Sequence, residues 1–337
     1  MSARIACIER LIAELRASRG IAHKRDVSGV AAVLPNAPAG IRLGDDAAAI
    51  PDGDGYLLFA AEGFLNEFVE AEPWFAGWCG VMVNVSDISA MGGRPLAVVD
   101  AVWSRDGERA RPILEGLREA ASAYGVPLVG GHTNNRNARG EQLSVAILGR
   151  ARRLLTSFDA APGDHLLAAI DLRGRYHEPY AYWDASTGPA IDPGRLRGDL
   201  DLLPALAEAG LCRAGKDISM GGLAGTVLML LECSGLGAVI DLDAVPRPPD
   251  APLSRWLCSF PSYGFLLAVS PADVAAVCSH FRQRDIACAD IGICDASGLV
   301  RLREAGEPPA LFWDLRREPL IGMGAGAMTQ TASEAAP

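Results

Sequence analysis

The first 40 residues of the chain divide into a segment with a helical hydrophobic period and a following segment without one. Apolar residues recur at helical spacing over residues 4–17, among them Ile8, Leu11 and Leu15, and this period predicts an amphipathic helix. The next stretch, RGIAHKRDVSGVAAVLPNAPAG, combines glycine, proline and basic side chains. Glycine and proline interrupt regular structure, so the stretch predicts a mobile loop.

From residue 56 to residue 151, short apolar runs alternate with longer periodic segments. Short runs bounded by turn residues predict buried strands, and longer periodic segments predict helices. The expected order is a strand at 56–61, a helix at 74–93, a strand at 95–103, a helix at 113–124, and strands at 126–131 and 143–151.

The composition becomes loop-like at TSFDAAPGD, residues 156–164, and the alternation then restarts. The second half predicts strands at 165–170, 237–242, 263–269 and 286–293, and helices at 199–209, 218–235 and 271–284. This mixture favours an α+β or α/β sandwich over a doubly wound sheet. We therefore expect a two-domain α/β (α+β) protein, with domains at 1–155 and 156–320 and a disordered tail at 321–337.

Charge and composition narrow the possible partners. The chain has 337 residues, 50% of them hydrophobic, and a formal net charge of -10. No basic cluster interleaved with aromatic residues offsets that charge, so neither nucleic acid nor an anionic membrane surface is an expected partner. ATP stays possible, because magnesium and backbone N–H groups can supply local positive charge.

Targeting and redox signals are weak. The start, MSARIACIER, has no apolar core long enough for a signal peptide, and no run approaches the roughly 18 apolar residues of a membrane span, so we expect a cytoplasmic protein. The eight cysteines form no C-x-x-C pair and are expected to be reduced and mostly buried. The five histidines are equally dispersed, which excludes a His/Cys zinc spacing.

Candidate chemistry gathers where acidic residues stand among small ones. These residues are Asp45 and Asp46 in RLGDDAAAI, Glu62 in FAAEGF, Asp87 in NVSDISAMGG and Asp217 in KDISMGG. Hard cations such as magnesium prefer oxygen ligands, and a triphosphate needs such ions to neutralise its charge.

Each carboxylate also has a structural interpretation. Asp45 or Asp46 could cap a turn, and Glu62 could be a charge at a strand end. Asp87 could be a helix residue satisfied by a neighbouring side chain, and Asp217 could cap the next helix. The set of five in this order is harder to explain structurally than any one of them.

The motifs GDDAA, AAEGF, NVSDISAMGGRP, GGHT and KDISMGGLA, in this order, resemble the superfamily of aminoimidazole ribonucleotide synthase, thiamine-monophosphate kinase, selenophosphate synthetase and the hydrogenase maturation dehydratase. The resemblance runs from about Arg42 to Asp295 and is strongest to the aminoimidazole ribonucleotide synthase-related branch. It implies an N-terminal α/β domain that completes a β-barrel across a homodimer, and a C-terminal α/β sandwich.

The resemblance also implies ATP and magnesium as cofactors. By motif position, Asp46, Glu62, Asp87 and Asp217 would hold magnesium, with Asp45 as a secondary ligand. The nucleotide would contact a second set of residues, namely Asn84, Gly130, Gly131, Thr133 and Lys216. Lys24 is a candidate catalytic residue, and Arg25 a further candidate for phosphate charge, although flexible side chains of this kind are more often solvated surface residues.

Two positions depart from the family pattern. Glu62 stands where aspartate is usual, which adds one methylene. His132, in GGHT, stands where thiamine-monophosphate kinases carry a magnesium-binding aspartate. Because neutral imidazole is a poor ligand for magnesium, His132 is a candidate to contact phosphate or to act as acid or base; it could also be a loop histidine bonded to the backbone.

The sequence thus predicts a magnesium-dependent, ATP-using enzyme acting on a small-molecule substrate. It would transfer the γ-phosphoryl group to an oxygen of a small metabolite, either as the final product or as an activated intermediate. The alternative is a nucleotide-binding regulatory or scaffold subunit that has lost turnover, and the departures at Glu62 and His132 keep that alternative open.

Overall fold

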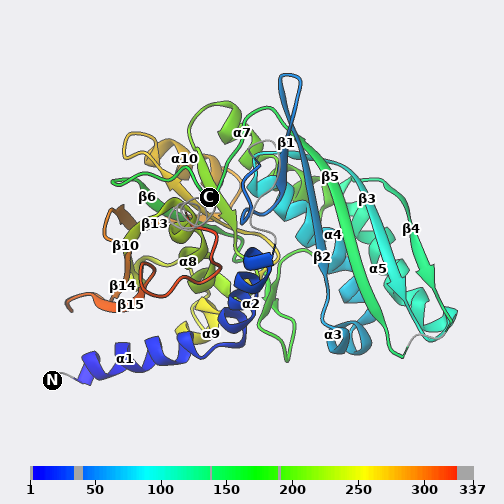
Figure 1. The fold of residues 1–337 in the computed structure, drawn as a ribbon, viewed down its shortest axis with the longest axis horizontal. Coiled ribbons are helices and arrows are strands. Elements are labelled where there is room, and N and C mark those ends of the chain that lie inside the picture. Colours follow the sequence, from blue (N-terminus) through cyan, green and yellow to red (C-terminus); the bar gives the residue numbers. More distant parts are fainter. Residues whose placement is uncertain (1–2, 34–40, 137–138, 189–190, 325–337) are drawn as a thin grey trace, which may run out of the picture. The chain divides into compact units, whose positions relative to one another are not determined.

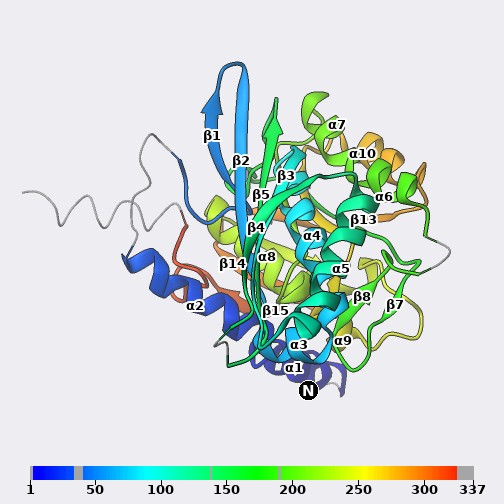
Figure 2. The ribbon, with the colours of Figure 1, turned by 90° about the vertical axis from the view of Figure 1, so that its right-hand side faces the viewer.

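A computed structural model describes residues 3–33, 41–136, 139–188 and 191–324, which form two compact units. One unit comprises Met1–Asp45, Leu155–Thr187 and Ala209–Pro337, and the other comprises Asp46–Leu154 and Gly188–Glu208. Each unit therefore includes a piece of chain distant in sequence from its main body. We call them the seven-strand unit and the five-strand unit, after their main sheets (Figures 1 and 2).

The five-strand unit is built on one mixed sheet with strand order β1-β2-β5-β3-β4, in which only β3 and β4 run parallel. Its strands are β1 (Ala48–Asp52), β2 (Gly55–Gly63), β3 (Arg94–Trp103), β4 (Leu128–Asn134) and β5 (Gln142–Ala151). Its helices are α3 (Asn66–Ala71), α4 (Pro73–Ala90), α5 (Gly107–Tyr124), α6 (Pro193–Leu200) and α7 (Leu202–Glu208).

Helices α4 and α5 cover one face of this sheet (Figures 1 and 2). On β5, Leu143, Val145 and Ile147 are buried on that face, which we call the helix face. The other face, the open face, carries exposed apolar side chains. Ile50, Phe59 and Val99 are 39%, 51% and 40% exposed. The sheet has free edges at β1 and β4, so the described residues of this unit do not close a barrel.

Two glycines let α4 and α5 touch. A Cβ atom added at Gly77 would lie 2.1 Å from the carbonyl oxygen of Ile113, and one at Gly116 would lie 2.0 Å from that of Trp74. Both contacts are to helix backbone, which cannot move without separating the helices.

The substitution Gly116→Ala is therefore expected to lower the free energy of unfolding by about 1–3 kcal/mol, the usual cost of overpacking a core. Gly29→Ala is the matched control, because nothing lies within 4 Å of its added Cβ and alanine favours a helix. Denaturant titration of both variants measures the difference. Equal stabilities would contradict the close contact.

The seven-strand unit has a main sheet of order β15-β14-β10-β13-β6-β12-β9 and a small sheet of order β11-β8-β7. The main strands are β6 (His165–Ile170), β9 (Ala214–Asp217), β10 (Gly237–Asp241), β12 (Gly264–Val269), β13 (Ala287–Asp295), β14 (Leu299–Arg303) and β15 (Ala310–Asp314). The small sheet contains β7 (Arg175–Tyr176), β8 (Tyr182–Asp184) and β11 (Phe260–Pro261). The helices are α1 (Ala3–Arg16), α2 (Arg19–Val33), α8 (Gly222–Ser234), α9 (Leu253–Leu257) and α10 (Val274–Arg282), with a 3-10 turn, η2, at Leu242–Ala244.

Strand β6 is buried on both faces, as expected for a sheet inside a layered unit. Leu166 and Ala168 join the core formed with α8, while Leu167 and Ala169, on the other face, are also fully buried. The mixed α/β character predicted from the sequence is confirmed.

The loop predicted after the first helix is wrong over most of its length, because residues 19–33 form helix α2. Tertiary contacts explain the difference. Ile21 is completely buried in the core of the unit, and Gly20 meets the backbone of Gly221, where an added Cβ would lie 2.6 Å from Cα. Residues 34–40 lie outside the described part of the chain.

The predicted tail, 321–337, is described only as far as Gly324. Its first residues are held by Glu232, a buried residue of α8 whose carboxylate accepts hydrogen bonds from four successive backbone N–H groups, Leu320 to Met323, at 2.5–3.3 Å.

All eight cysteines are free thiols. Burial raises the pKa of Cys212 and Cys294 to about 12, so these thiols stay protonated.

Candidate metal and nucleotide site

The two aspartates of the GDD motif have different surroundings. The carboxylate of Asp45 accepts hydrogen bonds from the backbone N–H of Ser157 at 3.1 Å and from its hydroxyl at 2.7 Å. The preceding Gly44 has a φ of 109°, which glycine adopts without strain, and its carbonyl accepts the thiol of Cys233. Asp45 thus fixes the start of the motif, while Asp46 is half-buried just before β1.

Asn84 and Asp87 lie one turn apart on α4 and are both buried. The amide nitrogen of Asn84 donates to the carbonyl oxygens of Gly80 and Val145, at 2.8 and 3.3 Å, which fixes the orientation of the amide. Its Oδ1 atom is then buried, and no described residue donates a hydrogen bond to it. An acceptor in this state needs a ligand or a bound water.

Within the five-strand unit, Asp46 and Asp87 each place a carboxylate oxygen within 4.8 Å of the other. Two oxygens bound to one magnesium ion are separated by at most about 4.2 Å, twice the metal–oxygen distance, so a small movement suffices. Two carboxylates and the buried acceptor of Asn84 are all oxygen donors. This donor set fits a hard cation.

Glu62 lies at the end of β2, with its side chain on the helix face. In the sheet register Glu62 is opposite Val145, and Val145 is in turn opposite Asp100 of β3. Laterally paired residues point to the same face, so Glu62 and Asp100 flank Val145, the residue whose carbonyl binds Asn84. Burial raises the pKa of the Asp100 carboxyl above its usual value. Asp100 is a polar residue that the sequence analysis missed, although an aspartate inside the apolar run PLAVVDAVW is a visible signal.

The GGHT motif forms the centre of β4, an exposed edge strand. Gly131 is paired with Asp100 on the helix face, whereas His132 is paired with Ala101 on the open face, where its ring lies 6.4 Å from that of Trp103. Thr133 returns to the helix face. The strand therefore separates His132 from Asn84 and Asp87, which lie on the other side of the sheet.

The basic candidates lie in the seven-strand unit. Lys24 of α2 donates to the hydroxyl of Ser219, in the KDISMGG motif, at 3.1 Å. Lys216 and Asp217 end β9 and are 4% and 3% exposed. Arg25 pairs with Glu318 and lies over the ring of Trp313, at 4.9 Å from its centroid. The structure therefore brings Lys24 to the KDISMGG motif but gives Arg25 a structural environment.

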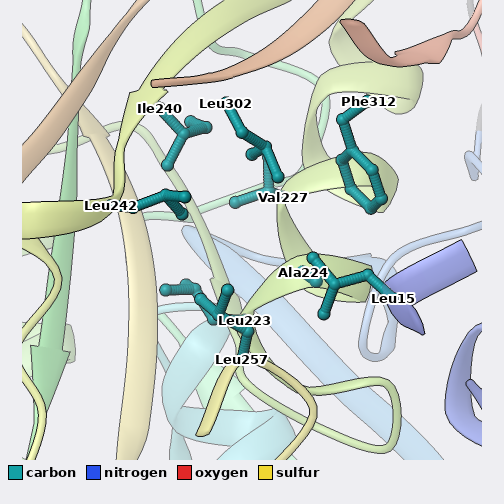
Figure 3. A pocket seen from close by; sticks show the side chains of 9 residues that line it. All are labelled: Leu15, Leu223, Ala224, Val227, Ile240, Leu242, Leu257, Leu302 and Phe312. Atoms are coloured by element: carbon teal, nitrogen blue, oxygen red, sulfur yellow. The ribbon is translucent and has the colours of Figure 1, made fainter. Parts of the chain in front are cut away.

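A cavity in the seven-strand unit lies apart from these residues. Figure 3 shows its nine apolar lining side chains, which come from α1, α8, α9 and the neighbouring strands. Its volume is about 10 Å³, and an apolar space of this size offers a water molecule no polar partners. It is a packing defect of the core and not a binding site.

Among the described residues, no helix combines the length and apolar character needed to cross a membrane.

Comparison with known proteins supports the motif assignment. Residues 44–151 match the family model "AIR synthase related protein, N-terminal domain", and residues 170–304 match the corresponding C-terminal domain. The chain is 48% identical over 319 residues to the uncharacterized protein sll0787 of Synechocystis, covering 93% of this chain and 97% of that one. It is 30% identical to the phosphoribosylformylglycinamidine synthase subunit PurL of Halorubrum lacusprofundi, but spans only 38% of its length.

Solved structures show the same fold. T. maritima PurL complexed with ATP matches with a TM-score of 0.69 at 22% identity, over 79% of this chain and 45% of that one. The protein tt0281 of Thermus thermophilus matches with a TM-score of 0.66 at 25% identity, over 84% and 97%. The two family models together cover more than half of the residues, and the chain therefore belongs to the AIR synthase related protein family.

Proposed function

We propose that this protein is a magnesium-dependent, ATP-using enzyme that transfers the γ-phosphoryl group to an oxygen of a small metabolite. The observation that carries the proposal is the pair of carboxylates at Asp46 and Asp87, within 4.8 Å of each other, beside the buried acceptor of Asn84. Family membership supports ATP as the phosphoryl donor, since PurL structures are described as complexes with ATP and ADP.

Asp46 and Asp87 are the proposed magnesium ligands. Glu62 and Asp217 are also proposed as magnesium ligands, and the support for these two is only that their motifs resemble those of the family. Asp45 is at most a secondary ligand, because Ser157 already occupies its carboxylate. When bound, magnesium neutralises the charge of the triphosphate. The buried Oδ1 of Asn84 is suited to accept a hydrogen bond from a water that accompanies the nucleotide.

In the proposed reaction, an acceptor oxygen forms a bond to the γ-phosphorus while the bond from that phosphorus to the oxygen bridging to the β-phosphate breaks. ADP leaves with the bond electrons, and the proton of the acceptor passes to a base. The backbone N–H groups of Gly130, Gly131 and Thr133 are candidates to bind phosphate oxygens, and Lys24 and Lys216 are candidates to neutralise their charge. His132 faces the open side of the sheet, opposite to Asn84 and Asp87, so its side chain is not placed to act as the base at these carboxylates.

We further propose that the protein is a homodimer in which the open face of the five-strand sheet is covered by the same face of a second copy. The support is the exposure of Ile50, Phe59 and Val99, three large apolar side chains on one face of one sheet. Contiguous apolar surface of this kind marks an interaction site, and a two-fold axis pairs identical surfaces.

The test of the function is to incubate the protein with magnesium, ATP and a pooled extract of small metabolites, and to follow the products by mass spectrometry. We expect ADP and not AMP, because attack at the γ-phosphorus releases ADP. One extract fraction should raise ADP formation, and Asp46→Asn should reduce it by about 100-fold or more, since a metal ligand is lost. His132→Ala changes a side chain on the opposite face of the sheet and should have a much smaller effect.

AMP and pyrophosphate would contradict γ-transfer. Tight ATP binding without turnover in any fraction would contradict the enzyme and favour the scaffold. Asp54→Asn, an exposed carboxylate in the β1–β2 hairpin, makes the same chemical change outside the site and should leave turnover unchanged.

A further inference from the structure

Asp100 is a buried carboxylate with no interaction partner among the described residues. It lies in β3 between Val98 and Val102, which are completely buried on the same face, and is itself only 8% exposed. Neither a hydrogen bond nor an ion pair reaches its oxygens from any described part of the chain. Partial loss of hydration disfavours the charged carboxylate, and no contact in the described part of the chain explains why an aspartate stands here.

The carboxylate lies directly over Gly131 of the GGHT motif. A Cβ atom added at Gly131 would lie 2.1 Å from Oδ2 and 2.7 Å from Oδ1 of Asp100. Gly131 has no positive φ that would require glycine, so the space taken by the Asp100 carboxylate is what excludes a side chain here. Asp100 and the GGHT motif thus form one local unit.

The position opens toward solvent at one side. Gly131 is exposed because β4 is the edge of the sheet, and Thr133, on the same face, is exposed as well. A small molecule lying on the helix face of β4 would reach the Asp100 carboxylate past a residue without a side chain. Glu62 lies in the same lateral row, two strands away.

We propose that Asp100 contacts the phosphoryl acceptor, by accepting a hydrogen bond from an N–H or O–H group of that molecule beside Gly131. This inference rests on the proposed function. The acceptor is then a polar metabolite that carries a hydrogen-bond donor in addition to the oxygen that receives the phosphoryl group. Binding of the acceptor supplies the partner that the protein itself does not provide.

The test compares Asp100→Asn with the wild type in three measurements: the half-saturating amount of the extract fraction that raises ADP formation, the Kd of ATP with magnesium, and the Tm. We expect half-saturation to rise by about 10-fold or more, as for loss of a hydrogen bond to a charged group. The ATP Kd should stay within about two-fold. The Tm should be unchanged or higher, because a partly desolvated charge is removed and no hydrogen bond within the described residues is lost. Asp54→Asn should change none of the three.

Gly131→Ala is the second variant. Its methyl group displaces the carboxylate without changing its charge, so half-saturation should rise here too. An unchanged half-saturation in Asp100→Asn would overturn the inference, and so would a clear fall in its Tm, which would show a structural role. If no fraction stimulates the wild type, the proposed function fails separately. In that case the Tm of Asp100→Asn is compared with that of the wild type. A lower Tm would overturn the inference that no group of the protein binds the Asp100 carboxylate, and an equal or higher Tm would support it.

Discussion

Asp87→Asn is expected to weaken magnesium-dependent ATP binding by about 100-fold or more while leaving the Tm nearly unchanged. The amide has almost the same shape as the carboxylate, so the packing of α4 is preserved, but one negative charge that a cation requires is lost. Without magnesium, the wild type should bind ATP weakly, because the carboxylates of Asp46 and Asp87 repel the triphosphate.

Isothermal titration calorimetry of ATP, with and without magnesium, measures both effects. Asp54→Asn is the control for a change of net charge, because its carboxylate is exposed and paired with Arg150 at a hairpin. An ATP affinity in Asp87→Asn equal to that of the wild type would show that this pair of aspartates does not hold the metal.

Phe59→Asp is expected to convert the protein from a dimer into a monomer of 35.4 kDa. Phe59 is 51% exposed on the open face of the sheet, so an aspartate there does not disturb the core beneath it. In a dimer that buries this face, the same aspartate would place a charge from each copy in an apolar interface, which is strongly unfavourable.

Light scattering at micromolar concentration distinguishes the two masses. Val33→Asp is the matched control, since Val33 is a 76% exposed apolar residue in α2, which is not part of the five-strand unit, and its substitution should leave the mass unchanged. A wild type that already behaves as a monomer would contradict the homodimer and the barrel across it.

The long elements of the five-strand unit could be predicted from sequence. Helix α4 and strands β2, β3 and β5 lie close to the predicted ranges, because each is long enough to display its period and ends at a glycine, a proline or a polar turn. Helix α5 ends as predicted but begins at Gly107, six residues before the predicted start, and continues through Pro112. The order of the acidic motifs also sufficed to identify the family, since it depends on residue identity and spacing alone.

Elements without a clear hydrophobic period could not be predicted in this way. Strand β9 was missed because four residues, AGKD, show no period, and it forms by pairing with β12, more than 45 residues away in sequence. Helix α2 was missed because its glycines and basic residues argue against a helix, and burial of Ile21 outweighs that preference.

The sequence by itself determined the family and the chemistry of the side chains: carboxylates and amides suited to magnesium, and a basic segment near the N-terminus. Only the tertiary structure decided which of them meet. In the folded chain, Asp45 accepts hydrogen bonds from Ser157, and Asp46 lies beside Asp87. His132 and Gly131 face opposite sides of one strand. The physical reason is that residue type and local period are properties of neighbouring positions, whereas strand pairing and helix packing join positions far apart in the chain.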